Sequence, residues 1–289
     1  EMRSLALAGN DHTVQRRDFV EQYEKVPEYW SHDLGLVMGW LVGDGWVSEG
    51  VQRKSIGFAF ADDEALALIH EPLSNWFGPG SLVQRGTVRQ LTYGYVPFRF
   101  FQTLGVSTKR AHEKRLPDSI WIAPREAVVG LLQGLFGADG TVGLNPLKQD
   151  CTVRLASSSR VLLEDVQILL SNFGIVSRIY QRRSVTNRHM PDGKGGSRLY
   201  HSQPQYELVI GKANRDRFAE LIGFAHWLGY ACLAEAYGDY GRVPEAVEMG
   251  ERAVGLAPND PLVRRSYAYT YEVRGMYREA IREYQTATG

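Results

Sequence analysis

The chain has 289 residues, about twice the ~150 residues of a typical domain, so we expect two domains or three small ones. Hydrophobic residues make up 44% and charged residues 23% of the sequence, which excludes disordered and fibrous proteins. Lys and Arg total 33, and Asp and Glu also total 33. Taken over the whole chain, this neutrality argues against a nucleic-acid partner.

Cysteines and apolar runs indicate neither a disulfide scaffold, a zinc site nor a membrane span. Cys151 and Cys232 are far apart and lie next to no histidine pattern, so we expect a reduced, intracellular and cytoplasmic protein. Glu1–Asn10 shows no secretory signal. The longest apolar run, Leu34–Val42, stops before Asp44 and is shorter than the ~18–20 residues of a membrane helix. We therefore expect a soluble protein with no membrane partner.

After an N-terminal extension of residues 1–30, residues 31–105 predict the order helix, strand, strand, helix, strand, strand, helix. The segments that we assign are Leu34–Gly43, Arg53–Phe60, Asp62–Phe77, a hairpin of Ser81–Arg85 and Val88–Tyr95 turned at Gly86, and Pro97–Leu104.

Residues 125–226 repeat this order after a linker at residues 106–124. The segment Asn187–Arg198 is predicted to be a polar, glycine-rich loop. Helices and strands interspersed in this way predict an α+β fold. The segments assigned in this half are Arg125–Ala138, Thr152–Ala156, Arg160–Asn172, Val176–Ser184, Gln205–Ile210 and Asn214–Ile222.

Residues 227–289 differ from the rest because their pattern repeats every 34 residues. Tyr237 recurs as Tyr271, and Gly241 recurs as Gly275. This period resembles that of tetratricopeptide repeats, which are α-helical hairpins. The segment can supply peptide or docking contacts, but one full repeat and part of a second offer little surface for a peptide-binding adaptor.

The first helix of each half carries small residues at every fourth position and ends in Asp-Gly. Small residues at this spacing let two helix backbones approach, so we expect the two helices to pack side by side. The small residues are Gly35, Gly39 and Gly43 in the first helix and Gly130, Gly134 and Ala138 in the second.

The acids that end these helices, Asp44 and Asp139, face the negative end of a helix dipole. This placement is disfavoured by roughly 0.3–1 kcal/mol, and bringing the two carboxylates together adds repulsion. A divalent cation would offset both effects. The alternative is turn chemistry alone, with a glycine after each helix, but its occurrence twice at equivalent places favours a site.

The segments Val37–Gly45 and Leu132–Gly140 resemble the signature of the LAGLIDADG homing endonucleases. The resemblance covers Ser31–Phe224, in the two-repeat, single-chain form, and the RLPDSIW sequence before the second motif resembles intein-type members. It implies a monomer with an internal pseudo-two-fold axis, in which two αββαββα half-domains form a β-saddle. Such a protein cuts both strands of a long double-stranded DNA site across the minor groove.

The resemblance also implies a Mg²⁺ site at Asp44 and Asp139, with the neighbouring Gly43 and Ala138 contributing. Mn²⁺ can replace Mg²⁺, and Ca²⁺ can bind without supporting cleavage. Metal-bound water would supply the nucleophile for phosphodiester hydrolysis.

Three further residues are candidates near the metal. Lys212 lies where the family often has a basic residue, which would stabilise charge on the phosphate, and a solvated loop lysine is the alternative. The first half has Tyr95 at the equivalent place, so the two centres are expected to be unequal. Asp62 and Ser157 can act on the metal through water, or each can be a helix N-cap.

Charge counted by segment reverses the conclusion drawn from net neutrality. Residues 84–115 hold seven basic residues and one acid, and residues 178–217 hold nine basic residues and three acids. A two-stranded ribbon fits the major groove, where alternate side chains read base edges. Solvation of an open sheet face is the alternative for each residue. The predicted DNA contacts are Arg53, Val83, Arg85, Gln90, Thr92, Lys109, Arg110, Arg154, Arg178, Tyr180, Arg182, Arg183, Gln205 and Glu207.

Within the linker, Lys109 and Arg110, together with Lys114 and Arg115, are expected to contact phosphates rather than bases. Two alternatives to an endonuclease stay open, namely a DNA-binding regulator that has lost catalysis and an RNA maturase. The presence of both motif acids favours the enzyme. The sequence has no catalytic Cys or Ser at its start and no His-Asn pair at its end, so self-splicing is not expected.

Overall fold

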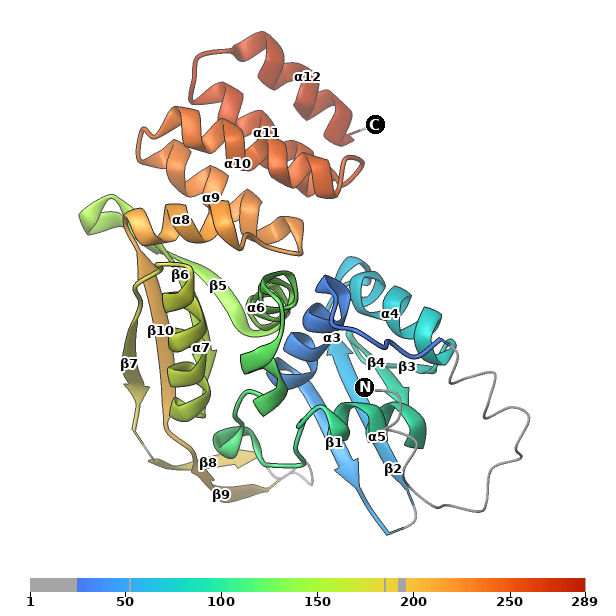
Figure 1. The fold of residues 1–289 in the computed structure, drawn as a ribbon. Coiled ribbons are helices and arrows are strands. Elements are labelled where there is room, and N and C mark those ends of the chain that lie inside the picture. The colour runs from blue at the N-terminus through green and yellow to red at the C-terminus, as the bar shows by residue number, and fades with distance from the viewer. Residues whose placement is uncertain (1–24, 52, 185, 192–195, 289) are drawn as a thin grey trace.

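The computed structural model describes residues 25–51, 53–184, 186–191 and 196–288. Two α+β units lie side by side, and a stack of helices at the C-terminal end covers one side of them (Figure 1). The predicted α+β class is therefore confirmed. None of the helices within the described residues is long and apolar enough to cross a membrane.

The first unit contains a four-stranded antiparallel sheet in the order β1-β2-β4-β3. Its helices and strands are α3 (His32–Gly43), β1 (Gly45–Glu49), β2 (Lys54–Phe60), α4 (Asp63–Phe77), β3 (Ser81–Arg85), β4 (Val88–Tyr93) and α5 (Tyr95–Thr103). Alternation places Ile56, Phe58 and Phe60 against the helices, where they are buried.

The second unit repeats the arrangement, with a sheet in the order β5-β6-β10-β7. Its helices and strands are α6 (Arg125–Asp139), β5 (Gly140–Asn145), β6 (Asp150–Ser157), α7 (Arg160–Asn172), β7 (Arg178–Arg183), β10 (Gln205–Gly211) and α8 (Ala213–Leu221). In each unit the first strand begins at the glycine of the Asp-Gly motif, Gly45 or Gly140.

The predicted loop at 187–198 is wrong in part, because β8 (Thr186–Pro191) and β9 (Ser197–Ser202) form an antiparallel pair. Among the described strands, β8 and β9 pair only with each other. Their sequence does not show the hydrophobic alternation by which a strand that covers a core is predicted. Residues 192–195 lie outside the described part of the chain.

The helices α3 and α6 pack side by side in parallel, as the small residues predict. A Cβ added at Gly39 would lie 2.1 Å from the carbonyl oxygen of Leu131, and one at Gly134 would lie 2.2 Å from that of Leu36. These two contacts exchange equivalent positions of the two motifs, which is the pattern of a two-fold axis. The backbones therefore approach as closely as glycine permits.

Four helices follow the second unit, and the first of them is fastened to it. They are α9 (Trp227–Asp239), α10 (Val243–Leu256), α11 (Pro261–Glu272) and α12 (Tyr277–Thr288). Tyr237 of α9 is buried between the guanidinium groups of Arg215 and Arg242, at 4.8 and 4.4 Å from its ring centroid. Its hydroxyl donates to Asp216 at 2.6 Å.

Candidate active site

The two motif acids lie where α3 and α6 end. Asp44 directly follows α3, and Asp139 is the last residue of α6. Because the helices are parallel and in contact, both acids lie at the same end of the pair. A Cβ on Gly43 would lie 2.8 Å from the Cβ of Ala138 and 3.3 Å from Oδ2 of Asp139, so the carboxylate of Asp139 rests against the end of α3.

This arrangement disfavours negative charge on both acids. Desolvation by the surrounding protein raises the pKa of Asp44 above its usual range, and the Lys114 ammonium opposes that shift. Desolvation, and next the charge of Asp44, raise the pKa of Asp139 to about 6, again against the effect of Lys114. A bound cation would stabilise the charged form of two carboxyl groups that are buried and close together in this way.

Lys114, from the linker, supplies the nearest positive charge. Its Nζ donates to the carbonyl oxygens of Val42 and Gly43 at 2.8 Å each and to that of Gly45 at 3.2 Å. The ammonium thereby caps the negative end of the α3 dipole. The prediction that Lys114 contacts phosphate is wrong, because its three donors are engaged within the protein. The prediction that Gly43 ligates a metal meets the same obstacle, since its carbonyl accepts from Lys114.

Burial lowers the pKa of Lys114, while the carboxylates of Asp139 and Asp44 act in the opposite direction. The charges of Asp44, Asp139 and Lys114 therefore affect one another's pKa values. The sequence did not reveal this, because a single lysine in an irregular linker carries no pattern and its contacts lie about 70 residues away.

Lys212 is not brought to the acids, contrary to the prediction. Leu155 of β6 pairs with Gly140 of β5 on one side and with Leu208 of β10 on the other. Lys212 follows Gly211, the last residue of β10. Four residues of strand separate Leu208 from Lys212, a distance of roughly 13 Å. Lys212 is exposed, with a positive φ of 55° at the N-cap of α8.

Asp62 and Ser157 differ in what they bond. Oδ1 of Asp62 accepts from the backbone N–H of Ala65 at 2.7 Å and so caps α4. Oγ of Ser157 accepts from the N–H of Ser159 at 3.0 Å, and Ser159 is the residue that caps α7. Asp62 therefore has the predicted N-cap role, and Ser157 stands two residues before the cap.

The four predicted DNA contacts on β3 and β4 share one face of the first sheet. Val83 pairs with Gln90, and Arg85 and Thr92 lie two residues further along their strands. Leu91, which points to the opposite face, is buried against the helices. The four side chains therefore lie on the face that the helices leave open. Arg53 is exposed in the loop before β2.

On the second sheet, predicted contacts on three strands form one cluster around Glu207. Arg182 donates to Glu207 at 2.6 Å, and Arg154 lies 3.6 Å from the same carboxylate oxygen. The guanidinium of Arg182 lies 5.4 Å from the ring centroid of Tyr180. Glu207 is thus already paired with two arginines, which orients them across the open face.

The other predicted contacts lie around this cluster or in the linker. Arg178 pairs with Val209, and Arg183 pairs with Gln205 beyond a bulge in β10. Lys109 and Arg110 are exposed in the linker and remain available to a phosphate backbone. Arg115 bonds Asp165 at 3.1 Å while its side chain is more than half exposed, so its predicted phosphate contact stays a prediction.

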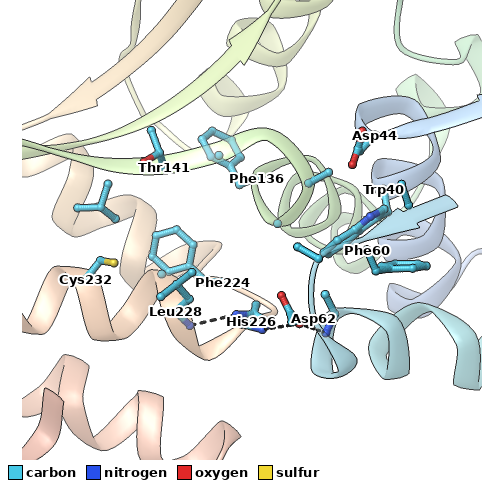
Figure 2. Close-up of a pocket in the computed structure, with 18 residues that line it drawn as sticks. Trp40, Asp44, Phe60, Asp62, Phe136, Thr141, Phe224, His226, Leu228 and Cys232 are labelled. Atoms are coloured by element: carbon cyan, nitrogen blue, oxygen red, sulfur yellow. Dashed lines mark hydrogen bonds and ion pairs between the residues drawn. The ribbon is translucent and has the colours of Figure 1, made fainter. Parts of the chain in front are cut away.

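A cavity of about 220 Å³ beside β5 is lined by one of the two motif acids, Asp44. It is bordered by Asp44 and Asp62 of the first unit and by His226, Leu228 and Cys232, which follow the second unit (Figure 2). His226 and Asp62 point toward each other, with Nε2 and Oδ1 3.3 Å apart (Figure 2). No sequence pattern predicted that these C-terminal residues lie near the motif.

The residues present fit a divalent cation. Asp44 and Asp139 offer carboxylate oxygens, and the carbonyl oxygen of Ala138 accepts from no side chain within the described residues. Oxygen donors of this kind are what Mg²⁺ prefers. Burial raises the pKa of both acids, and a bound cation would act against that rise by stabilising the charged carboxylates.

Comparison with known proteins finds a family match within the second unit. Residues 126–223 match the model of a LAGLIDADG-like domain. The chain is 27% identical over 217 residues to the ribonucleoside-diphosphate reductase NrdEB subunit alpha of Bacillus subtilis, covering 66% of this chain and 19% of that protein. It is 30% identical over 199 residues to the DNA polymerase II large subunit of Thermococcus kodakarensis, covering 65% and 10%. The chain thus spans less than a fifth of either relative.

Among solved structures, variants of the homing endonuclease I-DmoI match at a TM-score of 0.45 and 15% identity, covering 68% of this chain and 97% of that one. The homing endonuclease I-WcaI bound to its DNA recognition sequence matches at a TM-score of 0.42 and 12% identity, covering 77% and 92%. The residues that match the LAGLIDADG-like domain, 126–223, include the second motif acid, Asp139.

Proposed function

We propose that the chain is a site-specific, Mg²⁺-dependent endonuclease that cuts both strands of a double-stranded DNA site. The observation that carries the proposal is the meeting of Asp44 and Asp139 at the ends of two helices related by a pseudo-two-fold axis. Duplex DNA has two-fold symmetry of its own, so such a pair suits two phosphates on opposite strands. Among the described residues, Lys114 is the one group that opposes the rise in the pKa of these two carboxyl groups.

Asp44 and Asp139 are the residues that would hold the metal. When bound, a divalent ion supplies an activated water and stabilises the leaving oxygen. Lys114 holds the end of α3 in place through hydrogen bonds to its last carbonyl oxygens, and its ammonium partly offsets the negative charges of Asp139 and Asp44. The chain itself therefore orients the acids and balances their charge.

DNA binding is supported by the open faces of both sheets. Arg85, Gln90 and Thr92 on the first sheet and Arg154 and Arg182 on the second present donors that can contact base edges or phosphates. We expect binding to weaken steeply with salt despite the neutral composition, because phosphate contacts release counterions.

The relatives support a separable module of the intein type. A reductase subunit and a polymerase subunit have unrelated names, yet this chain matches a segment of each that makes up at most 19% of its length. A segment shared between unrelated enzymes is best explained as an insertion with its own activity. For α9–α12 we propose tetratricopeptide-like hairpins that brace the second unit, since Tyr237 is buried against Arg215.

The test is a selection of cleaved sequences from a randomised double-stranded DNA library with the unmodified chain in Mg²⁺. Recovery of one long consensus sequence, absent when EDTA replaces Mg²⁺, is expected. A preparation of the D44N/D139N double variant controls for contaminating nuclease. Sequence-specific binding without cleavage would contradict the endonuclease and favour a regulator that binds DNA without cutting it.

A further inference from the structure

Three metal-ligating side chains from two distant parts of the chain meet at the N-terminal end of α4. Asp62 is the N-cap of α4 and Glu64 lies in its first turn, whereas His226 is the N-cap of α9. One ligand atom of each side chain lies within 4.8 Å of the ligand atoms of the other two. Within the described residues this is the one group of at least three such side chains. Neither motif acid belongs to it.

The distances in this cluster match the spacing of ligands around a tetrahedral ion. Nε2 of His226 lies 3.3 Å from Oδ1 of Asp62 and 3.3 Å from Oε2 of Glu64. An N–H···O hydrogen bond is usually about 2.9–3.0 Å long. Nε2 is buried and has no hydrogen-bond partner among the described residues. Two ligands bound to tetrahedral Zn²⁺ at about 2.0–2.1 Å lie roughly 3.3–3.4 Å apart, so an ion fits between the three atoms.

N–H groups of the protein already orient both carboxylates. The backbone N–H of Ala65 donates to Oδ1 of Asp62 at 2.7 Å, and the indole N–H of Trp227 donates to Oε2 of Glu64. Outer hydrogen bonds of this kind are typical of metal ligands, and a carboxylate that accepts one keeps lone pairs for the ion. The two acids are 49% and 41% exposed, so water can reach the ion and complete its coordination.

The imidazole of His226 must change tautomer to bind an ion. Its Nδ1 accepts from the backbone N–H of Leu228 at 3.2 Å, so the neutral ring carries its proton on Nε2. Binding through Nε2 moves this proton to Nδ1, and the N–H of Leu228 loses its acceptor. Loss of one N-cap hydrogen bond weakens binding about fivefold, which is small beside the contribution of an imidazole ligand.

We propose that Asp62, Glu64 and His226 bind one Zn²⁺ ion that joins the first unit to the C-terminal helices. Imidazole together with carboxylates suits Zn²⁺, whereas Mg²⁺ and Ca²⁺ take oxygen ligands. Two ligands belong to the start of α4 and the third to the start of α9, so the ion cross-links these helices. Figure 2 shows Asp62 and His226 facing each other beside the cavity. The proposal does not depend on the endonuclease function, because neither motif acid is a ligand.

The test measures Zn²⁺ binding by the full chain carrying D44N and D139N, which remove the carboxylates of the motif site. Calorimetric titration should give one Zn²⁺ per chain with a Kd on the order of 1 μM. Co²⁺ in place of Zn²⁺ should give the visible absorption of a tetrahedral ion. About 1 mM Mg²⁺ should not displace the Zn²⁺. Zn²⁺ at about 100 times its Kd should raise the unfolding temperature, because the ion binds the folded state.

Two substitutions in this background identify the ligands. Asn is itself a good N-cap, so H226N removes the imidazole and can still cap α9, while E64Q keeps an oxygen that accepts from Trp227. Each should weaken Zn²⁺ binding by at least about 100-fold. The matched controls are E71Q, later in the same helix, and H112N, in the linker. Both controls should bind Zn²⁺ within about twofold of the parent.

The outcomes decide between an ion site and a hydrogen-bonded contact. Absence of tetrahedral Co²⁺ absorption, or a Zn²⁺ Kd above about 100 μM, would overturn the inference. Equal weakening by E71Q or H112N would also overturn it. The unfolding temperature in EDTA shows which variants are folded, and unchanged affinity in folded H226N or E64Q would contradict the assigned ligands. These measurements use no DNA, so failure to cut DNA would overturn the proposed function and leave this inference standing.

Discussion

The two halves have the same order of helices and strands, but different segments of the chain pack against them. In the first half the motif helix ends under the ammonium of Lys114, which reaches it from the linker. In the second half no cation caps α6 among the described residues, and the unit is held instead by buried Arg215 and the stack of C-terminal helices. Duplicated elements thus supply the symmetric geometry, and the connecting segments set the electrostatics of each half.

The largest effect is expected for substitutions of the glycines where α3 and α6 cross. These substitutions test the symmetric packing of the two helices. G39A and G134A should each destabilise the fold by about 3 kcal/mol or more, because a Cβ would lie 2.1 or 2.2 Å from a backbone oxygen of the other helix. Urea unfolding measures both. Gly255, whose added Cβ would meet nothing within 4 Å, is the control, and G255A should be neutral or stabilising. A large difference between the unfolding free energies of G39A and G134A would contradict a symmetric crossing of the two helices.

Substitution of Arg215 tests the feature that the first half lacks, the attachment of α9 to the second unit. Its side chain is 3% exposed and bonds Asp150 at 2.5 Å and Asp216 at 3.0 Å. R215M should therefore destabilise the protein by roughly 2–3 kcal/mol, since partners in a largely buried site lose their cation. The exposed pair of Arg160 and Glu164 gives the control, and R160M should cost below about 0.5 kcal/mol. Equal effects in thermal unfolding would show that α9 is not fastened through Arg215.

The motif acids should make stability depend on pH. The folded protein raises the pKa of Asp139 from 3.8 to about 6, so the folded state holds a proton in that window that the unfolded state has released. Stability should therefore fall as pH rises from about 4 to 6 through this group. D139N should melt higher than the unmodified protein at pH 7.5 in EDTA, and the difference should shrink toward pH 4. A difference that does not vary with pH would contradict the raised pKa.

Helix caps test the smallest difference between the halves. Asp62 caps α4 directly, whereas its counterpart Ser157 accepts from the N–H of Ser159, two residues along. D62A should destabilise the protein by about 1 kcal/mol and S157A by less than half of that. Thermal unfolding of the two variants under one set of conditions compares them. The reverse order would contradict the direct capping of α4 by Asp62.

Local sequence patterns predicted the parts of the fold that depend on local spacing. The small residues at every fourth position predicted the crossing of α3 and α6, and alternation predicted β2 and the hairpin of β3 and β4. The loop at 187–198 was missed because β8 and β9 pair only with each other. Lys212 was misplaced because its position depends on strand register, which the sequence of one strand does not specify.

The site was predicted less completely than the fold. Asp44 and Asp139 follow from a repeated motif, so two independent copies point to them. Lys114 and His226 reach the site through tertiary contacts of isolated residues, and no periodicity marks either. Charge counting identified the basic hairpins, but it did not show that Arg115 is paired with Asp165.

The most direct test of the account compares cleavage of the selected DNA target by D44N, D139N and D33N in Mg²⁺. Asp33 lies at the exposed start of α3, far along the helix from the motif end, so D33N controls for loss of one acid. We expect D44N and D139N to bind the target but to lose at least about 100-fold in cleavage rate, while D33N cuts like the unmodified protein. Unchanged cleavage by D44N or D139N would contradict the assignment of the active site.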